Sequence, residues 1–291
     1  MTASTTDIRR IAGDWEATFL QLLASANDRV LLCAPFISQV GAAGVARARH
    51  GKRDIGGKSL VLTDLSPRAV CAGATEPGAV ASLRSSLSGS RLVHLPRLHA
   101  KVYIADGRAA IVTSGNLTSG GIRRNYEYGV YVDDPSLAGD IESDLLDYAS
   151  LGADIDERML ANYCDVAESA KVAYAMHLAS SSKATERRLS NALREADDAL
   201  IRTRLAGGAM HTVFARTIEF LLRREGPLAT VELHPLIQRI HPDLCDDSVD
   251  RVIDGHSFGK KWKHAVRTAQ QQLKSAGKVA LLDGRWRLTK T

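Results

Sequence analysis

The segment LHAKVYIAD, residues 98–106, followed by AAIVT at 109–113, decides the fold. Both contain short apolar runs of the kind that form buried strands. Asp106-Gly107-Arg108 separates them, and Asp-Gly is a strong signal for a tight hairpin turn. We therefore predict two adjacent antiparallel strands over 100–105 and 109–113.

Working outward, similar apolar runs predict strands at 29–35, 58–63, 90–95 and 126–132, with helices at 14–26 and 79–87. Strands that alternate with helices indicate a layered α/β domain, which we place at 1–136. Residues 137–206 carry almost no strand signal. They are predicted as a helical spacer or dimerisation element, broken near 180–182. Gly207-Gly208 is the expected boundary to a last domain at 207–291.

Composition excludes several classes of protein. The chain has 291 residues, of which 45% are hydrophobic and 24% charged, as in soluble globular proteins. No segment approaches the roughly 20 apolar residues that a membrane span needs, so no membrane contact is expected. The polar N-terminus carries no apolar signal segment, which favours a cytoplasmic location. The four cysteines show no Cys-x-x-Cys spacing and are interpreted as small buried residues.

The positive charge is concentrated at one end of the chain. Residues 207–291 hold 14 Lys and Arg against 9 Asp and Glu, whereas residues 1–206 hold 24 of each. A basic domain joined to a neutral one suggests that the last domain binds a polyanion.

The polar residues of the hairpin suggest phosphate chemistry. On a strand, residues i and i+2 point to one face, so His99 and Lys101 are predicted to project together. The neighbouring strand ends in Thr113-Ser114-Gly115-Asn116, which brings a hydroxyl and an amide to the same edge. Lysine and asparagine can hold phosphoryl oxygens, while histidine can attack phosphorus or protonate a leaving group. No cluster with metal-ligand spacing appears, so neither a metal nor another cofactor is expected.

The order His-x-Lys-x4-Asp, with Ser114, Gly115, Asn116 and Glu127 following, resembles the phospholipase D superfamily over about residues 15–135. The segment 34–38, APFIS, also looks like an early strand end of its members. The single-motif nucleases and metal-independent restriction endonucleases are the most similar in layout. The implied fold is an α-β-α sandwich with a mixed sheet.

The resemblance also implies a two-step reaction at six site residues. His99 would form a phosphohistidine, Lys101 and Asn116 would bind phosphoryl oxygens with Ser114 in support, and Glu127 would orient an imidazole. Asp106, the last residue of the motif, is expected to be a structural turn residue more often than a catalytic one.

That mechanism needs a second histidine, and the sequence holds one motif. His94 and His256 are not followed by lysine at the required spacing. A homodimer with both motifs at one two-fold axis would solve this, because one His99 could attack while its symmetry mate protonates the leaving group.

The last domain has the element order of a winged helix. Helices are predicted at 212–224, 230–240 and 259–276, followed by a hairpin of 278–282 and 285–289 across Asp283-Gly284. Trp262, Val266, Ala269 and Leu273 form one stripe of the third helix. The predicted DNA contacts are Lys263, Arg267, Gln270 and Lys274 on a second stripe, with Lys278, Arg285 and Arg287 on the hairpin.

These features together favour a homodimeric, metal-independent DNA phosphodiesterase, with a role in restriction or antiviral defence suggested by architecture alone. Other subunits of a defence system would then be further partners. Two alternatives stay open. A lipid phosphodiesterase would share the same signature, and a non-catalytic DNA-binding subunit would share the same tail.

Overall fold

The computed structural model describes residues 7–12, 15–180, 182–205, 209–253 and 256–289. The chain forms two compact units that divide between Leu200 and Ile201. The predicted boundary at Gly207-Gly208 lies outside the described residues, and each unit is considered by itself below.

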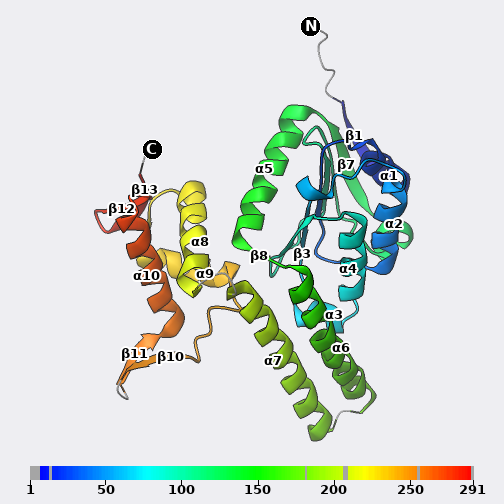
Figure 1. Cartoon of the computed structure of the whole chain (residues 1–291). Coiled ribbons are helices and arrows are strands. Elements are labelled where there is room, and N and C mark those ends of the chain that lie inside the picture. The colour runs from blue at the N-terminus through cyan, green and yellow to red at the C-terminus, as the bar shows by residue number, and fades with distance from the viewer. Residues whose placement is uncertain (1–6, 13–14, 181, 206–208, 254–255, 290–291) are drawn as a thin grey trace. The chain divides into compact units, whose positions relative to one another are not determined.

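Unit 1 is built around a mixed sheet in the order β1-β7-β6-β5-β2-β3-β4-β8 (Figure 1). Strands β2, β3 and β4 run parallel, and all other neighbours pair antiparallel. This arrangement confirms the α/β class and the mixed sheet. The strands are β1 (Asp7–Ala12), β2 (Val30–Cys33), β3 (Leu60–Thr63), β4 (Arg91–His94), β5 (Val102–Ala105), β6 (Ala109–Thr113), β7 (Tyr128–Asp133) and β8 (Ala153–Asp154).

Helices cover both faces of the sheet. Figure 1 shows α5 on one face and α1, α2 and α4 on the other. The helices of unit 1 are α1 (Glu16–Ser25), α2 (Gln39–Arg49), α3 (Pro67–Cys71), α4 (Pro77–Ser86), α5 (Pro135–Leu151), α6 (Glu157–Ala179) and most of α7 (Lys183–Leu205), with short turns η1 (Gly56–Lys58) and η2 (Gly120–Arg124). Two of them, α2 and α3, and the strands β1 and β8 were not predicted.

The helices at 157–200 belong to unit 1. Tyr163 and Ala170 of α6, and Ala196 of α7, are buried in the same apolar core as Phe19 of α1. The Tyr163 hydroxyl also donates a hydrogen bond to Leu65 O. This segment, predicted as a spacer, therefore contributes to the core of unit 1.

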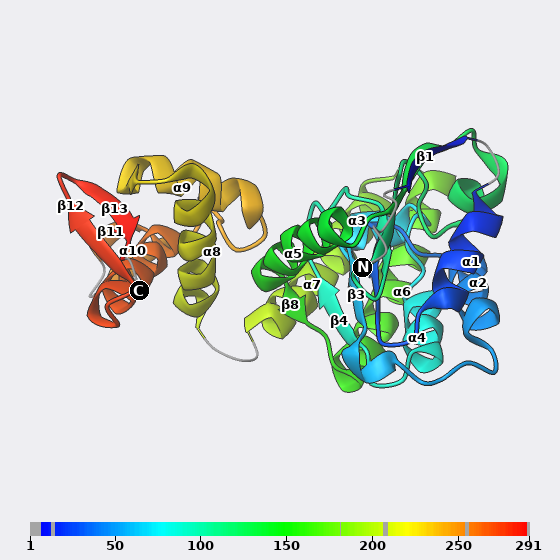
Figure 2. The same ribbon diagram turned by 90° about the horizontal axis from the view of Figure 1, so that it is seen from above.

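The described residues of unit 2 form the end of α7, three further helices and two small sheets (Figure 2). The helices are α8 (Met210–Glu225), α9 (Thr230–Ile240) and α10 (Lys261–Ser275). The strands are β9 (Leu228–Ala229), β10 (Asp250–Ile253), β11 (His256–Lys260), β12 (Val279–Leu282) and β13 (Arg285–Leu288). Asp283 and Gly284 both have positive φ, as the tight turn predicted between β12 and β13 requires. The strands β9, β10 and β11 were not predicted.

Strand register places two sets of residues at opposite edges of the large sheet. Cys33 pairs with Val102, and Val102 pairs with Val112. Residues that follow β2, precede β5 or follow β6 therefore share one edge. Residues that precede β2 or follow β5 share the other edge, and the candidate site occupies the first.

Candidate active site

His99 and Lys101 lie side by side in the extended segment that leads into β5. The Lys101 ammonium is 3.1 Å from His99 Nε2 and 3.3 Å from Nδ1, and it donates to His99 O at 2.9 Å. His99 is exposed, whereas Lys101 is buried. The structure thus joins an accessible imidazole to a fixed cation, as the i, i+2 spacing predicted.

Burial changes the electrostatics of this cation. Desolvation lowers the pKa of Lys101, and the nearby Glu127 carboxylate opposes that shift by raising it. The net pKa lies below the ordinary value for lysine. Lys101 can therefore present a weakly hydrated positive charge to an anion beside His99.

Ser114 and Glu127 form a second polar pair at the same edge. Ser114 follows β6, and its hydroxyl donates to Glu127 Oε2. Asn125 Nδ2 donates to Glu127 Oε1 at 3.1 Å. Both carboxylate oxygens of Glu127 thus accept hydrogen bonds from Ser114 and Asn125. From the sequence, Glu127 was expected to orient an imidazole. The ring nitrogens of His99 meet Lys101 instead.

Two aromatic residues hold the Ser114-Gly115-Asn116 loop from behind. The Tyr103 hydroxyl donates to Gly115 O at 2.9 Å, and Trp15 Nε1 donates to Gly121 O at 2.5 Å. The two rings stack with centroids 5.4 Å apart. A Cβ atom at Gly115 would lie 2.6 Å from the Trp15 ring, so only glycine fits. Asn116 follows on the same loop, and its Oδ1 is buried without a hydrogen-bond partner in the described part of the chain.

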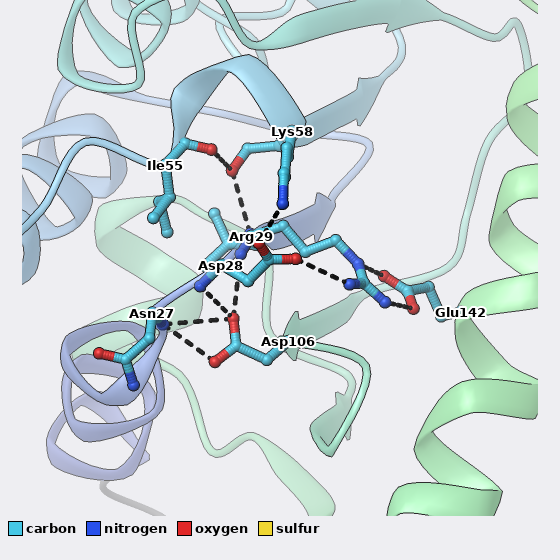
Figure 3. Close-up of polar contacts among 9 residues, drawn as sticks. Asn27, Asp28, Arg29, Ile55, Lys58, Asp106 and Glu142 are labelled. Atoms are coloured by element: carbon cyan, nitrogen blue, oxygen red, sulfur yellow. Dashed lines mark hydrogen bonds and ion pairs between the residues drawn. The ribbon is translucent and has the colours of Figure 1, made fainter.

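Asp106 lies at the other end of β5 from His99, and this corrects its inclusion among the catalytic residues. Its carboxylate accepts from the backbone N–H groups of Asn27, Asp28 and Arg29 at 2.8 to 3.2 Å (Figure 3). Burial raises the pKa of Asp106, but these backbone donors outweigh burial and lower it. Asp106 is a structural latch between the β5–β6 turn and the start of β2.

The latch extends to α5 through a partly buried ion pair. Arg29 Nε and Nη2 donate to the two oxygens of Glu142 at 2.8 and 2.7 Å (Figure 3). Gly107 has φ +65°, and a Cβ there would meet Glu142 at 2.6 Å. The turn after β5 is therefore fixed both in conformation and by its neighbours.

His94, the nearest histidine in sequence, is buried at the end of β4. Its Nδ1 accepts from the backbone N–H of Leu65 at 3.0 Å. A ring engaged in this way holds the loop after β3, and it is not exposed for chemistry beside His99.

The predicted DNA contacts in unit 2 fall into three groups. Arg267 and Lys274 are exposed on α10, and Lys263 is half-buried over the Trp262 ring. On the hairpin, Lys278 pairs with Glu219, Arg285 with Glu232 and Arg287 with Asp283. Gln270 differs from expectation, because its side chain is buried and donates to Thr230 Oγ1 at 3.1 Å.

The described residues lack two kinds of feature. None of the helices there is long and apolar enough to cross a membrane. Within the same residues, no group of three or more His, Cys, Asp or Glu side chains is placed to hold a metal ion.

Residues 19–147 match the family model described as "Cardiolipin synthase, PLD-like domain". This segment, which holds the whole candidate site, is thus similar to a phospholipase D-like domain. Members of the phospholipase D superfamily cleave or transfer phosphodiesters. No curated protein sequence matches the chain.

Several solved structures are similar over about half of the chain. The phospholipase D family member Nuc from Salmonella typhimurium shows 18% identity and a TM-score of 0.41, covering 52% of this chain and 99% of that one. NucT from Helicobacter pylori shows 14% identity and a TM-score of 0.39, covering 49% and 95%. Phosphatidylserine synthase from Haemophilus influenzae shows 14% identity and a TM-score of 0.38, covering 50% and 38%.

Sequence reasoning missed the residues that support the motif. Trp15 falls within the helix predicted at 14–26, and nothing in its position indicates contact with the loop that holds Gly115 and Gly121. Asn125 carried no signal at all. Glu127 did carry a signal, because it is one of the residues on which the resemblance to the phospholipase D superfamily rests.

Proposed function

We propose that the chain is a DNA phosphodiesterase that uses His99 as a nucleophile and needs no metal ion. The observation that carries the proposal is the exposed His99 ring within 3.3 Å of the buried Lys101 ammonium. A phosphate placed there would have its charge held by Lys101 while a ring nitrogen faces phosphorus.

The proposed reaction has two steps. A ring nitrogen of His99 attacks phosphorus, the P–O bond to one nucleoside breaks, and a second imidazole gives its proton to the leaving oxygen. Water then attacks the phosphohistidine, loses a proton to the same second imidazole and releases the phosphate product. Ser114 and Asn116 follow β6 at this edge of the sheet, and the Ser114 hydroxyl and the Asn116 Nδ2 amide group would donate to the phosphoryl oxygens.

A second copy of the chain would supply the second imidazole. His94 is buried and engaged with Leu65, so it is a poor proton donor for an exposed phosphate. A symmetric homodimer that brings two His99 rings together provides both roles with one motif. The two rings would then titrate as a coupled pair.

Unit 2 would bind the DNA as a winged helix. Its support is the order of three helices followed by the β12–β13 hairpin, the net positive charge of residues 207–291, and the exposed Arg267 and Lys274 on α10. A role in restriction or antiviral defence is part of this proposal and rests on the same architecture.

The decisive test is incubation of plasmid and single-stranded DNA with the full chain in EDTA. We expect cleavage by wild type and none by His99→Ala, with Glu168→Gln, an exposed change on α6, as the matched control. Abolition by the chelator would contradict the histidine mechanism. Retained DNA binding without cleavage by either protein would favour a non-catalytic subunit.

The tail is tested by its salt dependence. Each phosphate contact that is lost should reduce the slope of log K against log salt by about 0.9. The Arg267→Ala and Lys274→Ala changes are made together in the His99→Ala chain, which cannot cleave the DNA. We expect them to weaken DNA binding and to reduce the slope by up to about 1.8, the value for two lost contacts. An unchanged slope would contradict the assignment of α10 to DNA.

A lipid phosphodiesterase is the second candidate, because the family model that matches residues 19–147 carries the description of a cardiolipin synthase. Parallel assays with phosphatidylglycerol and cardiolipin vesicles distinguish it. Release of a headgroup that depends on His99, with DNA left intact, would replace the nuclease proposal.

A further inference from the structure

Two exposed aromatic side chains flank one residue of the candidate site. All seven tyrosines of the chain are among the described residues, and of these Tyr126 and Tyr128 are exposed. Tyr126 is 103% exposed and Tyr128 is 58% exposed. They precede and follow Glu127, which accepts a hydrogen bond from the Ser114 hydroxyl. Single exposed apolar residues are common on proteins, but two rings beside one site residue point to a ligand.

Hydrogen bonds fix the backbone of this segment beside the site. The Tyr128 N–H donates to Ser114 Oγ at 3.1 Å, and Tyr128 O accepts from the Ser114 N–H at 3.0 Å. The Glu127 N–H donates to Asn125 O at 3.1 Å, and the Asn125 side chain donates to the Glu127 carboxylate. Tyr126 lies between these two residues, so its backbone is held while its ring is in solvent.

Strand pairing places the tyrosines near the reacting groups. Lys101 O accepts from the Thr113 N–H at 3.1 Å, and the next residue, Ser114, pairs with Tyr128. Lys101 and Tyr128 are therefore about two strand spacings, or about 10 Å, apart across the sheet edge. A nucleotide that neighbours a phosphate held by Lys101 and His99 can span that distance.

The chemistry of the segment favours nucleic acid. Arg124 is exposed two positions before Tyr126, and Arg123 pairs with Glu16 at 2.8 Å. Proteins bind single-stranded nucleic acid with this combination, because aromatic rings stack on unpaired bases and cations pair with phosphates. Residues 123–128, with the sequence RRNYEY, contain no aliphatic side chain of the kind that a bilayer or a second copy of the chain would cover.

We propose that Tyr126 and Tyr128 stack on unpaired nucleobases next to the phosphodiester under attack, and that the chain therefore prefers single-stranded DNA to duplex DNA. The inference rests on the proposed nuclease function and names the form of its substrate. In a duplex each base face is covered by its neighbours in the stack, so the rings have nothing to bind. Every base has a π-face, so we expect little dependence on base identity.

The test compares two ligands of equal length, an oligothymidylate and a strand of abasic deoxyribose phosphates. Binding is measured with the full His99→Ala chain, which cannot cleave. Changing Tyr126→Ala and Tyr128→Ala together should weaken oligothymidylate binding by about tenfold or more. The same pair of changes should alter binding of the abasic strand by less than about twofold, because the stacking partner is missing.

Three single variants separate stacking from other effects. Tyr126→Phe keeps the ring and should retain binding of the oligothymidylate, whereas Tyr126→Leu keeps apolar bulk and should lose as much as Tyr126→Ala. Leu178→Ala removes another exposed apolar side chain, 68% exposed on α6, and should match the His99→Ala parent. Tyr126 is fully exposed, so none of its variants should shift the melting temperature by more than about two degrees.

Cleavage is measured in parallel with tyrosine variants that retain His99. Wild type should cut a single strand faster than the duplex of the same sequence. Tyr126→Ala with Tyr128→Ala should lower kcat/KM for the single strand by about tenfold, as expected for lost stacking. Equal losses on single strand and duplex, or equal losses on the oligothymidylate and the abasic strand, would overturn the inference while cleavage by wild type upholds the nuclease function.

Two other results would assign the rings to a different partner and overturn the inference. A shift from dimer to monomer on sedimentation of Tyr126→Ala would assign them to a contact between two copies. Binding of phosphatidylglycerol vesicles that Tyr126→Ala abolishes, without coupling to bases, would assign them to a membrane. If wild type cuts no nucleic acid, the nuclease function fails. The binding comparison then still decides whether the tyrosines stack on bases.

Discussion

The two ends of β5 carry the two halves of one sequence motif and differ in how their polar groups are satisfied. Before the strand, His99 is exposed, and its ring nitrogens lie 3.1 and 3.3 Å from the Lys101 ammonium that is proposed to serve a ligand. After the strand, Asp106 accepts three backbone N–H groups, and the neighbouring Arg29 is paired with Glu142. A group with its hydrogen bonds filled from within the chain maintains the fold, and a group left accessible can serve chemistry.

The largest effect should follow from changing the exposed end. His99→Asn keeps a polar side chain and removes the nucleophile, so phosphodiester cleavage should fall by at least about 10³-fold. The melting temperature should stay within a degree or two of wild type, because the exposed ring supports no core contact. A cleavage rate within tenfold of wild type would break the comparison, since the chemistry would then lie elsewhere.

Asp106→Asn should have the opposite profile. It replaces a carboxylate that accepts several backbone N–H groups by an amide with one acceptor oxygen, at a cost of about 1–3 kcal/mol in unfolding free energy. The left-handed backbone at Asp106 (φ 55°) tolerates asparagine, so strain adds little. Cleavage per folded molecule should be unchanged. Urea melts with a parallel activity assay measure both quantities.

The pH dependence sharpens the same point. Folding lowers the pKa of Asp106, so its contribution to stability is present above the ordinary aspartate pKa and is lost as the pH falls through the folded-state value. The difference in unfolding free energy between wild type and Asp106→Asn should therefore shrink in acid. A difference that is constant with pH would mean that the charge of Asp106 does not matter.

The smallest effect is expected from Glu127→Gln. Glu127 raises the pKa of Lys101 against desolvation, so removing its charge should lower that pKa further. Lys101 would then lose its proton at lower pH, and the alkaline limb of kcat/KM should move to lower pH. Lys101→Arg should extend that limb upward, since arginine stays charged. An alkaline limb that moves in neither variant would show that Lys101 does not control it.

Local signals accounted for most of unit 1. The turn at Asp106-Gly107 and the apolar strands on either side were predicted because strongly apolar runs and a required left-handed turn leave little choice. Strand β1 was missed because most of its side chains are exposed, so no alternation marks it. Helix α2 was missed because Gly41 and Gly44 weaken its helical pattern, and packing against other elements compensates for that.

In unit 2 the error at Gln270 was geometric. With about 100° per residue, Gln270 lies about 40° from Val266 and 60° from Leu273 around α10, inside the apolar stripe. Arg267 lies about 100° from Val266 and stays exposed. The cavity lined by Ser38, Glu76, Asn116 and Asn125 could not be predicted, because only the tertiary fold brings these residues to one place.

Trp15 is a natural fluorescent reporter on the Ser114-Gly115-Asn116 loop. It is the one tryptophan of unit 1, since the other two of the chain's three, Trp262 and Trp286, are in unit 2. Its indole is buried against Gly115 and donates to Gly121 O. Its emission therefore depends on whether the loop keeps these contacts. Replacing both other tryptophans by phenylalanine would leave Trp15 as the single tryptophan of the chain. Binding of a DNA oligonucleotide that moves the Ser114-Gly115-Asn116 loop would then change the wavelength or intensity of the Trp15 emission, without any added label.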